Sequence, residues 1–234
     1  VGNYLVSKYI KENTDCKVIF NGDGADELMG GYLYMKKAPN FYEFDKECKR
    51  LIQDIYMYDV LRSDKSISSN GLEPRTPFLD RAWVEYYFSL NKELRYETTK
   101  NICEKYLLRK AVEVSDSKLL PYKILWRTKE AFSDGVSTLN RSWFQIIQEK
   151  IDKLCENDSN FNNELHLLMK TYQNLPLSNN KLNTKEQAYY RYLFNKNYKN
   201  CDHLIPYYWM PRYIDADDAS ARTLNVYSEN NSNM

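Results

Sequence analysis

Carboxylates, an amide and glycines gather directly after a short, mainly apolar run near the N-terminus of this 234-residue chain. The run is Lys17–Phe20, and the residues that follow it include Asn21, Asp23, Asp26 and Glu27. Its β-branched composition predicts a buried strand that ends in a loop. In open α/β sheets, ligands bind beyond the carboxyl ends of the strands. Because three carboxylates so close together repel one another, the spacing predicts a cation, a bound proton or water between them.

The glycines of this loop indicate where the backbone turns sharply. We expect Gly22 and Gly24 to adopt positive φ and let the backbone approach a ligand, and Gly30 and Gly31 to allow close packing or a bend. A solvated turn is the alternative interpretation of so many aspartates and glycines. A calcium-binding EF-hand loop is excluded because Ala25 stands where an oxygen ligand is needed. The phosphate-loop pattern G-x-x-x-x-G-K-[ST] does not occur in the chain.

The composition argues against several classes of protein. The net charge is +1 and Lys and Arg are interspersed with Asp and Glu, so no nucleic-acid partner is expected. No apolar run approaches the ~18 residues that span a bilayer, so no membrane partner is expected either. The five cysteines form no C-x-x-C pair, which argues against a disulfide framework or a zinc site and favours the reducing cytoplasm. A single compact unit is expected at this length.

The order of elements at the N-terminus predicts an α/β fold with an incomplete parallel sheet. An amphipathic helix is expected over Asn3–Asn13, and it leads directly to the strand at Lys17. Helix followed by strand is half of a βαβ unit, so the strand that should precede the helix is missing. The chain begins at Val1 without an initiator Met, and we therefore expect it to be a fragment of a longer protein.

The middle of the chain predicts mostly helices. Apolar residues at three- and four-residue steps predict one helix from Phe41 to about Asp64, on which Asp59 and Arg62 lie three residues apart. At that spacing the two form either an ordinary surface ion pair or, with Arg62 pointing at a ligand, part of a phosphate site. The two prolines of Glu73–Pro77 predict an extended segment.

Three further helices are expected after that segment. Asp80 should cap a helix over Arg81–Ser89. Its apolar residues and the leucine that follows it are expected in the core: Trp83, Tyr86, Tyr87 and Leu90. The next helices are predicted over Ile102–Val114 and from Trp143 to about Leu154.

The C-terminal third is less regular. The Asn-rich stretch Asn157–Asn163 predicts a loop, and a tyrosine-rich helix is expected over Gln187–Phe194. Residues 215–234 predict a polar tail, with disorder over Asn230–Met234.

Lys129 is a second candidate for chemistry. A lysine in a turn is ordinarily solvated. Here Trp126 and Phe132 flank it with apolar side chains, which are expected to hold the ammonium in a partly desolvated place where it stabilises developing phosphate charge.

Taken together, these stretches resemble the synthetase domain of the glutamine-dependent asparagine synthetase family. Residues 17–40 resemble its S-G-E-G-[AS]-D-E-x-x-G-G-Y-x-Y segment. Further blocks of the chain resemble family segments in the same order: Met57–Arg62, Glu73–Asp80, Trp126–Gly135, Tyr208–Arg212 and Ser220–Leu224. The resemblance implies the C-terminal part of an adenine-nucleotide-alpha-hydrolase-like (ATP pyrophosphatase) domain over residues 1–214.

The resemblance also implies a reaction and its residues. A family member activates aspartate with ATP and Mg²⁺ as β-aspartyl-AMP, and ammonia from glutamine then displaces AMP to give asparagine. Asp26 matches the position expected to bind magnesium, and Lys129 the lysine that contacts the phosphates. The positions matching the nucleotide and pyrophosphate site are Asn21, Gly22, Asp59 and Arg62. The resemblance further implies cytoplasmic location and a homodimer of the full-length protein.

Asp23 matches the glutamate whose carboxylate assists the intermediate and takes a proton from ammonia. Aspartate is one methylene shorter, and Asn21 stands where the family has serine, so the two departures either compensate or weaken activity. The family's S-G-G-x-D-S loop and its N-terminal cysteine do not occur in this sequence. Two alternatives therefore stay open: another adenylate-forming amide ligase of the same superfamily, and a non-catalytic paralogue that acts as a scaffold.

Overall fold

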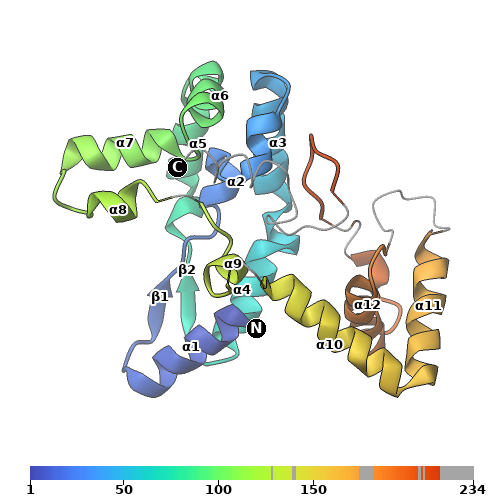
Figure 1. Ribbon diagram of the computed structural model, residues 1–234. Helices are drawn as coiled ribbons and strands as arrows, with labels where there is room; N and C mark the ends of the chain where they lie inside the picture. Colours follow the sequence, from blue (N-terminus) through green and yellow to red (C-terminus); the bar gives the residue numbers. More distant parts are fainter. Residues whose placement is uncertain (128, 139–140, 174–181, 205–206, 208, 217–234) are drawn as a thin grey trace. The chain divides into compact units, whose positions relative to one another are not determined.

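The computed structural model describes residues 1–216 except 128, 139–140, 174–181, 205–206 and 208 (Figure 1). The predicted tail from Asp215 thus falls almost wholly outside the described residues, as do Tyr208 and the block Ser220–Leu224. Two compact units are present where one was expected. The first unit is Val1–Glu130 with Arg212–Ile214, and the second is Ala131–Pro211 with Asp215–Met234.

The first unit is mostly helical with a small parallel sheet. Its helices and strands are α1 (Gly2–Asn13), β1 (Val18–Phe20), α2 (Ala25–Met29), α3 (Phe41–Asp54), α4 (Asp59–Ser68), β2 (Glu73–Arg75), α5 (Arg81–Ser89), α6 (Lys92–Asn101), α7 (Tyr106–Ser115) and α8 (Tyr122–Leu125). Short 3-10 helices cover Leu33–Lys37, Ile55–Met57 and Pro77–Leu79.

Strands β1 and β2 pair in parallel, with Val18 opposite Glu73 and Phe20 opposite Arg75 (Figure 1). The expected strand is therefore present, but the expectation that it is buried was wrong. Val18 is 47% exposed and Phe20 is 78% exposed. Only β2 pairs with β1 among the described residues, so apolar composition alone does not bury a strand that lacks covering layers.

The helix predicted from Phe41 to Asp64 is interrupted. Asn40 caps α3 by accepting hydrogen bonds from the backbone N–H groups of Tyr42 and Glu43, each at 3.0 Å. The chain leaves helical geometry at Tyr58, whose φ and ψ are −119° and −96°. The apolar face of α3 is buried as predicted, while the break starts a new helix at Asp59.

Helix α5 begins as expected, because Asp80 accepts a hydrogen bond from the backbone N–H of Trp83 at 3.2 Å. Tyr87 is buried, but the core assignment of Tyr86 was wrong because that side chain is 58% exposed. Helix α6 was not predicted from the sequence, although Asn91 caps it by accepting hydrogen bonds from the backbone N–H groups of Glu93 and Leu94.

The helix predicted over Ile102–Val114 starts later than expected. It begins at Tyr106, after Lys105, whose φ is 56°. Ile102 is 55% exposed and lies before this turn.

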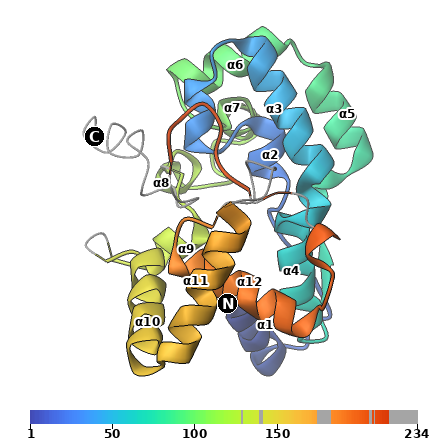
Figure 2. The same ribbon diagram turned by 90° about the vertical axis from the view of Figure 1, so that its right-hand side faces the viewer.

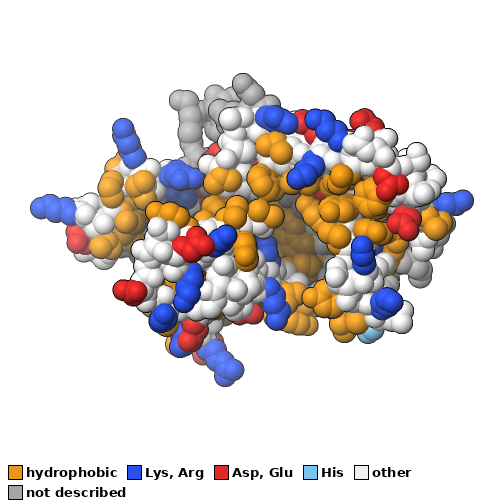
Figure 3. All heavy atoms as spheres, turned by 90° about the horizontal axis from the view of Figure 1, so that it is seen from below, with side chains coloured by type: hydrophobic (Ala, Val, Ile, Leu, Met, Phe, Trp, Pro, Cys, Tyr) orange, Lys and Arg blue, Asp and Glu red, His pale blue; other side chains and the backbone are white. Residues whose placement is uncertain are grey.

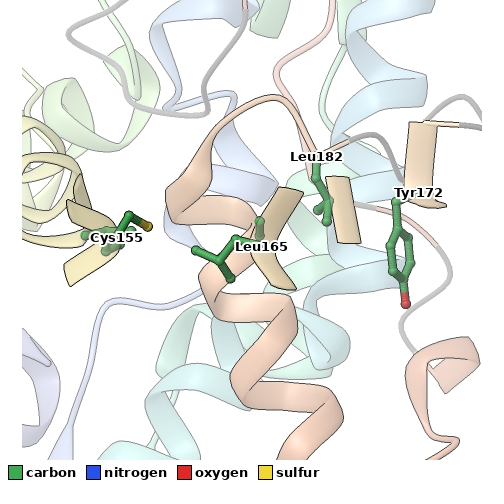
Figure 4. Close-up of a cluster of buried hydrophobic side chains, with 6 residues drawn as sticks. Cys155, Leu165, Tyr172 and Leu182 are labelled. Atoms are coloured by element: carbon green, nitrogen blue, oxygen red, sulfur yellow. The ribbon is translucent and has the colours of Figure 1, made fainter. Parts of the chain in front are cut away.

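The second unit contains α9 (Phe132–Gly135), α10 (Trp143–Asn157), α11 (Ser159–Gln173) and α12 (Lys185–Asn197). Helices α10, α11 and α12 bury a common apolar cluster that includes Cys155, Leu165, Tyr172 and Leu182 (Figure 4). The loop predicted over Asn157–Asn163 is wrong. Asp158 accepts a hydrogen bond from the backbone N–H of Phe161 at 3.0 Å, and this cap starts α11 inside the Asn-rich stretch.

Charged side chains of both signs are spread over the face drawn in Figure 3, with apolar side chains between them. Within the part of the chain that the structure describes, no helix is both long and apolar enough to cross a bilayer.

A buried ion pair joins α3 to α6, which lie side by side in Figure 2. The Arg95 side chain is 1% exposed, and its guanidinium donates to Asp45, which also accepts from Lys49 at 2.7 Å. Burial raises the pKa of Asp45, but the hydrogen bonds from Lys49 and Arg95 outweigh burial, so the pKa lies below its ordinary value. The guanidinium also lies 5.7 Å from the centre of the Tyr87 ring.

Asp45→Asn should lower the free energy of unfolding by about 3 kcal/mol at pH 7, because it leaves Arg95 buried without its counter-charge. A depressed carboxyl pKa stabilises the fold above about pH 4 and this contribution is lost as the pH falls below it. Urea unfolding should therefore show that the difference in the free energy of unfolding between wild type and variant is smaller at pH 3 than at pH 7. Lys49→Met is the control and should change little, because Lys49 is 59% exposed.

Candidate functional site

The loop between β1 and α2 adopts a tight turn that brings its polar residues together. Gly24 has φ 92° at the start of α2, and a Cβ there would lie 2.3 Å from the Leu79 side chain. The expectation for Gly24 is therefore confirmed. Gly22 is not among the described glycines with positive φ, so the same expectation for Gly22 was wrong.

Asp26 binds two lysines that come from distant parts of the first unit. Its Oδ1 lies 2.8 Å from Nζ of Lys105, and its Oδ2 lies 2.9 Å from Nζ of Lys129. All three side chains are about one-fifth exposed. Burial raises the pKa of Asp26, but the two ammonium groups outweigh burial and hold the pKa below its ordinary value. The carboxylate is therefore charged and shared between two cations at neutral pH.

Gly31 makes room for this arrangement. A Cβ at Gly31 would lie 2.0 Å from Oδ1 of Asp26 and 2.9 Å from its Cα. At Gly30, with φ 61°, a Cβ would lie 2.5 Å from the Phe44 ring. Close packing at both glycines is thus confirmed.

The described residues do not by themselves form a magnesium site at Asp26. Both carboxylate oxygens already face ammonium groups, which are not metal ligands. Within the described parts of the chain, no three His, Cys, Asp or Glu side chains lie close enough together to hold a metal ion. Magnesium binding by Asp26 stays a prediction.

Asp23 lies at the turn itself and touches α4. The Ser63 hydroxyl donates a hydrogen bond to its carboxylate, and Asn21 Oδ1 accepts from its backbone N–H at 3.1 Å. Burial raises the pKa of Asp23, in the direction that suits a general base. Arg62, Asp59 and Asp26 also act on this pKa, so these predicted site residues are neighbours.

Asn21 and Gly22 leave room for a ligand. The Nδ2 atom of Asn21 is buried and has no hydrogen-bond partner among the described residues, which is costly for a protein that binds nothing there. A Cβ at Gly22 would meet no atom within 4 Å, and Gly22 is exposed. A polar ligand with an acceptor atom fits this position.

The third carboxylate of the loop, Glu27, is 4% exposed and accepts a hydrogen bond from the Tyr32 hydroxyl. Burial and the nearby Asp59 raise the pKa of Glu27 to about 7. Close carboxylates were expected to need a cation, a bound proton or water between them. At Asp26 the cations are the ammonium groups of Lys105 and Lys129. At Glu27 the raised pKa favours a bound proton.

Asp59 and Arg62 form the predicted i, i+3 ion pair, with Nη2 to Oδ1 at 2.5 Å. The break at Tyr58 places Asp59 in the first turn of α4, where a negative charge is favourable. The Arg62 side chain is 60% exposed and its role toward phosphate stays a prediction.

The predicted apolar shield around Lys129 is only partly correct. Phe132 is 51% exposed and belongs to the second unit. The aromatic neighbour of the Lys129 ammonium is instead Tyr32, whose ring centre lies 5.9 Å from Nζ. Trp126 donates its indole N–H to Glu113 at 2.9 Å, which holds the segment before Lys129.

Sequence reasoning missed Ser63, Tyr32, Lys105 and Glu104, which contact the predicted residues. Ser63 had a usable signal, since it directly follows Arg62 on the same helix. Lys105 and Glu104 had none, because the turn at Lys105 brings the Lys105 ammonium to Asp26 and the Glu104 carboxylate to the Lys129 backbone.

Comparisons with known proteins agree over most of the chain. The family described as Asparagine synthase matches residues 1–47 and 36–172. The chain is 48% identical over 227 residues to the asparagine synthetase (glutamine-hydrolyzing) of Gallus gallus, and 44% identical over the same length to those of Homo sapiens and Cricetulus griseus. These matches cover 97% of this chain, which spans 38% of the length of each relative.

Gly31→Ala should lower the free energy of unfolding by about 1–3 kcal/mol, because the new methyl group forces Asp26 away from its lysines. Gly22→Ala is the matched control and should change it by less than about 0.5 kcal/mol, because that position is open. Urea unfolding of both variants checks this expectation. Equal, small effects would show that the space around Asp26 is not restricted.

Proposed function

Because the chain belongs to the asparagine synthase family, we propose that it forms part of an ATP-dependent asparagine synthetase. Its substrates are aspartate, ATP, and ammonia released from glutamine elsewhere in the enzyme. The observation that carries this proposal is the pair of ammonium groups on Asp26, next to a loop in which the buried Nδ2 of Asn21 has no hydrogen-bond partner among the described residues. The proposed fold of this region is that of an adenine-nucleotide-alpha-hydrolase-like domain.

The first step activates aspartate. A carboxylate oxygen is a poor leaving group, so the β-carboxylate attacks the α-phosphorus of ATP, the bond from that phosphorus to the bridging oxygen breaks, and pyrophosphate leaves. The Lys129 ammonium stabilises the charge that develops on pyrophosphate, with Arg62 in support. The two ammonium groups on Asp26 supply the positive charge that a phosphate group binds.

Asn21 and Gly22 contact the nucleotide in this proposal. The buried Nδ2 of Asn21 gains the acceptor that it lacks among the described residues. Gly22 lets the backbone approach the ligand because it has no side chain. Asp59 orients Arg62 through their ion pair.

The second step forms the amide. Ammonia attacks the β-carbonyl carbon of β-aspartyl-AMP, AMP leaves with the bonding electrons, and Asp23 takes the proton from nitrogen. The raised pKa of Asp23 supports this role, and the hydrogen bond from Ser63 orients the carboxylate. Homodimer formation and cytoplasmic location stay predictions.

Lys129→Ala in the intact enzyme should reduce aspartate-dependent pyrophosphate release by about 10²-fold or more, because the developing charge loses a positioned donor. Lys123→Ala is the matched control, since Lys123 is exposed on α8 and lies outside the site. Equal effects would assign Lys129 to a solvated turn. Release triggered by a larger carboxylate, but not by aspartate, would identify a different amide ligase of the same superfamily.

Asp23→Asn should reduce asparagine formation by about 10²–10⁴-fold, because an amide takes no proton from ammonia. The contact between Asn21 and Asp23 predicts coupling between these two positions. Asp23→Glu alone should overfill the place that Ser63 borders, and Asn21→Ser combined with Asp23→Glu should restore the rate. Steady-state rates for the two single variants and the double variant test this. Unchanged asparagine formation by Asp23→Asn would show that the Asp23 carboxylate has no catalytic role.

A further inference from the structure

Glu104 is a buried acid that the chemistry above does not use. Its side chain is 5% exposed. One carboxylate oxygen, Oε1, accepts from the backbone N–H of Lys129 at 3.0 Å and from Nη2 of Arg109 at 3.1 Å. The other oxygen lies 3.8 Å from Nζ of Lys36. Glu104 thus holds the main chain at the residue whose side chain reaches Asp26.

Arg109 holds the segment that leads to Lys129. Its Nε donates to the carbonyl oxygen of Glu104 at 3.0 Å, and its Nη1 donates to the carbonyl oxygen of Leu125. The Arg109 side chain is 13% exposed. A planar guanidinium with fixed donor directions therefore joins Glu104, which lies just before the start of α7, to the C-terminal end of α8, from which the chain leads to Lys129.

The left-handed backbone of Lys105 explains how two adjacent side chains serve one site. In helices and strands, adjacent side chains point in different directions. With φ 56° and ψ 26° at Lys105, the Glu104 carboxylate meets the Lys129 backbone while the Lys105 ammonium meets Asp26 at 2.8 Å. Such a conformation is unfavourable for a residue with a side chain and is found where the surroundings require it.

We propose that Glu104 is a positioning residue for Lys129. A lysine side chain has many rotamers, and the places that its ammonium group can occupy depend on the position of its backbone. The hydrogen bond that the Lys129 backbone N–H donates to Glu104 fixes the position of that backbone, so the ammonium meets Oδ2 of Asp26 and, on the proposed function, the departing pyrophosphate. A displacement of about 1 Å at such a group costs on the order of 10²-fold in rate.

Two substitutions separate the effect of the length of the Glu104 side chain from the effect of its charge. Glu104→Gln keeps the length and the acceptor oxygen but removes the charge, whereas Glu104→Asp keeps the charge but withdraws the oxygen by one methylene. In the intact protein, acetic anhydride labelling followed by peptide mass spectrometry gives the reaction rate of Lys129. We expect Glu104→Asp to raise that rate several-fold and Glu104→Gln to leave it near the wild-type value.

The reverse order would overturn the proposal, because Glu104 would then serve only as the counter-charge of Arg109. Equal rates for wild type and both variants would overturn it as well. Glu113→Asp is the matched control, since Glu113 holds the same segment at Trp126 rather than at Lys129. Glu113→Asp should leave the labelling rate of Lys129 unchanged. A rise equal to that of Glu104→Asp would show that any loosening of this segment exposes Lys129, and that Glu104 has no specific role in positioning it. If Glu104→Asp fails to fold while Glu104→Gln folds, unchanged labelling in Glu104→Gln supports the proposal and raised labelling overturns it.

Kinetics then separate this inference from the proposed function. Glu104→Asp should lower kcat for aspartate-dependent pyrophosphate release by about 10²-fold with little change in KM for ATP, and Glu104→Gln should recover most of the rate. Raised Lys129 labelling with unchanged kcat would leave the positioning role standing and remove the catalytic role of Lys129. Unchanged labelling with lowered kcat would overturn the positioning role while Lys129 keeps its proposed function.

Discussion

The carboxylate of Asp26 is the charge on which the arrangement of the first unit depends. Two ammonium groups from separate segments bind its two oxygens, and a partly buried carboxylate with one partner removed is strongly unfavourable. The N-terminal loop, the turn before α7 and the segment after α8 must therefore meet at one point. Gly31 permits this meeting because a side chain there would occupy the position of Oδ1 of Asp26.

Interruptions of regular structure position the remaining groups. The break at Tyr58 starts α4 at Asp59, so Asp59 and Arg62 lie in its first turns and Ser63 faces Asp23. The left-handed turn at Lys105 likewise sets the start of α7, at Tyr106. In both places a continuous helix would have carried the polar side chains to a different face, because helical residues rotate about 100° per position. The irregular residues are thus as important to the site as the charged ones.

The three carboxylates of the loop differ in the groups that surround them. Asp26 is held charged by lysines, Glu27 is buried beside Asp59 and Tyr32 and has a pKa of about 7, and Asp23 has a raised pKa next to Ser63. Carboxyl groups whose pKa values are pushed apart serve different purposes in acid–base chemistry. On the proposed function, Asp26 organises cations while Asp23 accepts a proton.

The sequence alone determined the loop composition, the cap at Asp80 and the contact of Gly31 with Asp26, because these depend on neighbours a few residues away. Local sequence patterns also predicted that most of the chain is helical, and the family resemblance supplied the seven candidate site residues. It did not predict the exposure of β1 or the breaks at Tyr58 and Lys105. Nor did it reveal Lys105 and Glu104, since the Lys105–Asp26 contact spans 79 positions. Only tertiary packing decides such pairs, because charges this far apart in sequence meet when the elements between them fold, and no local spacing encodes that distance.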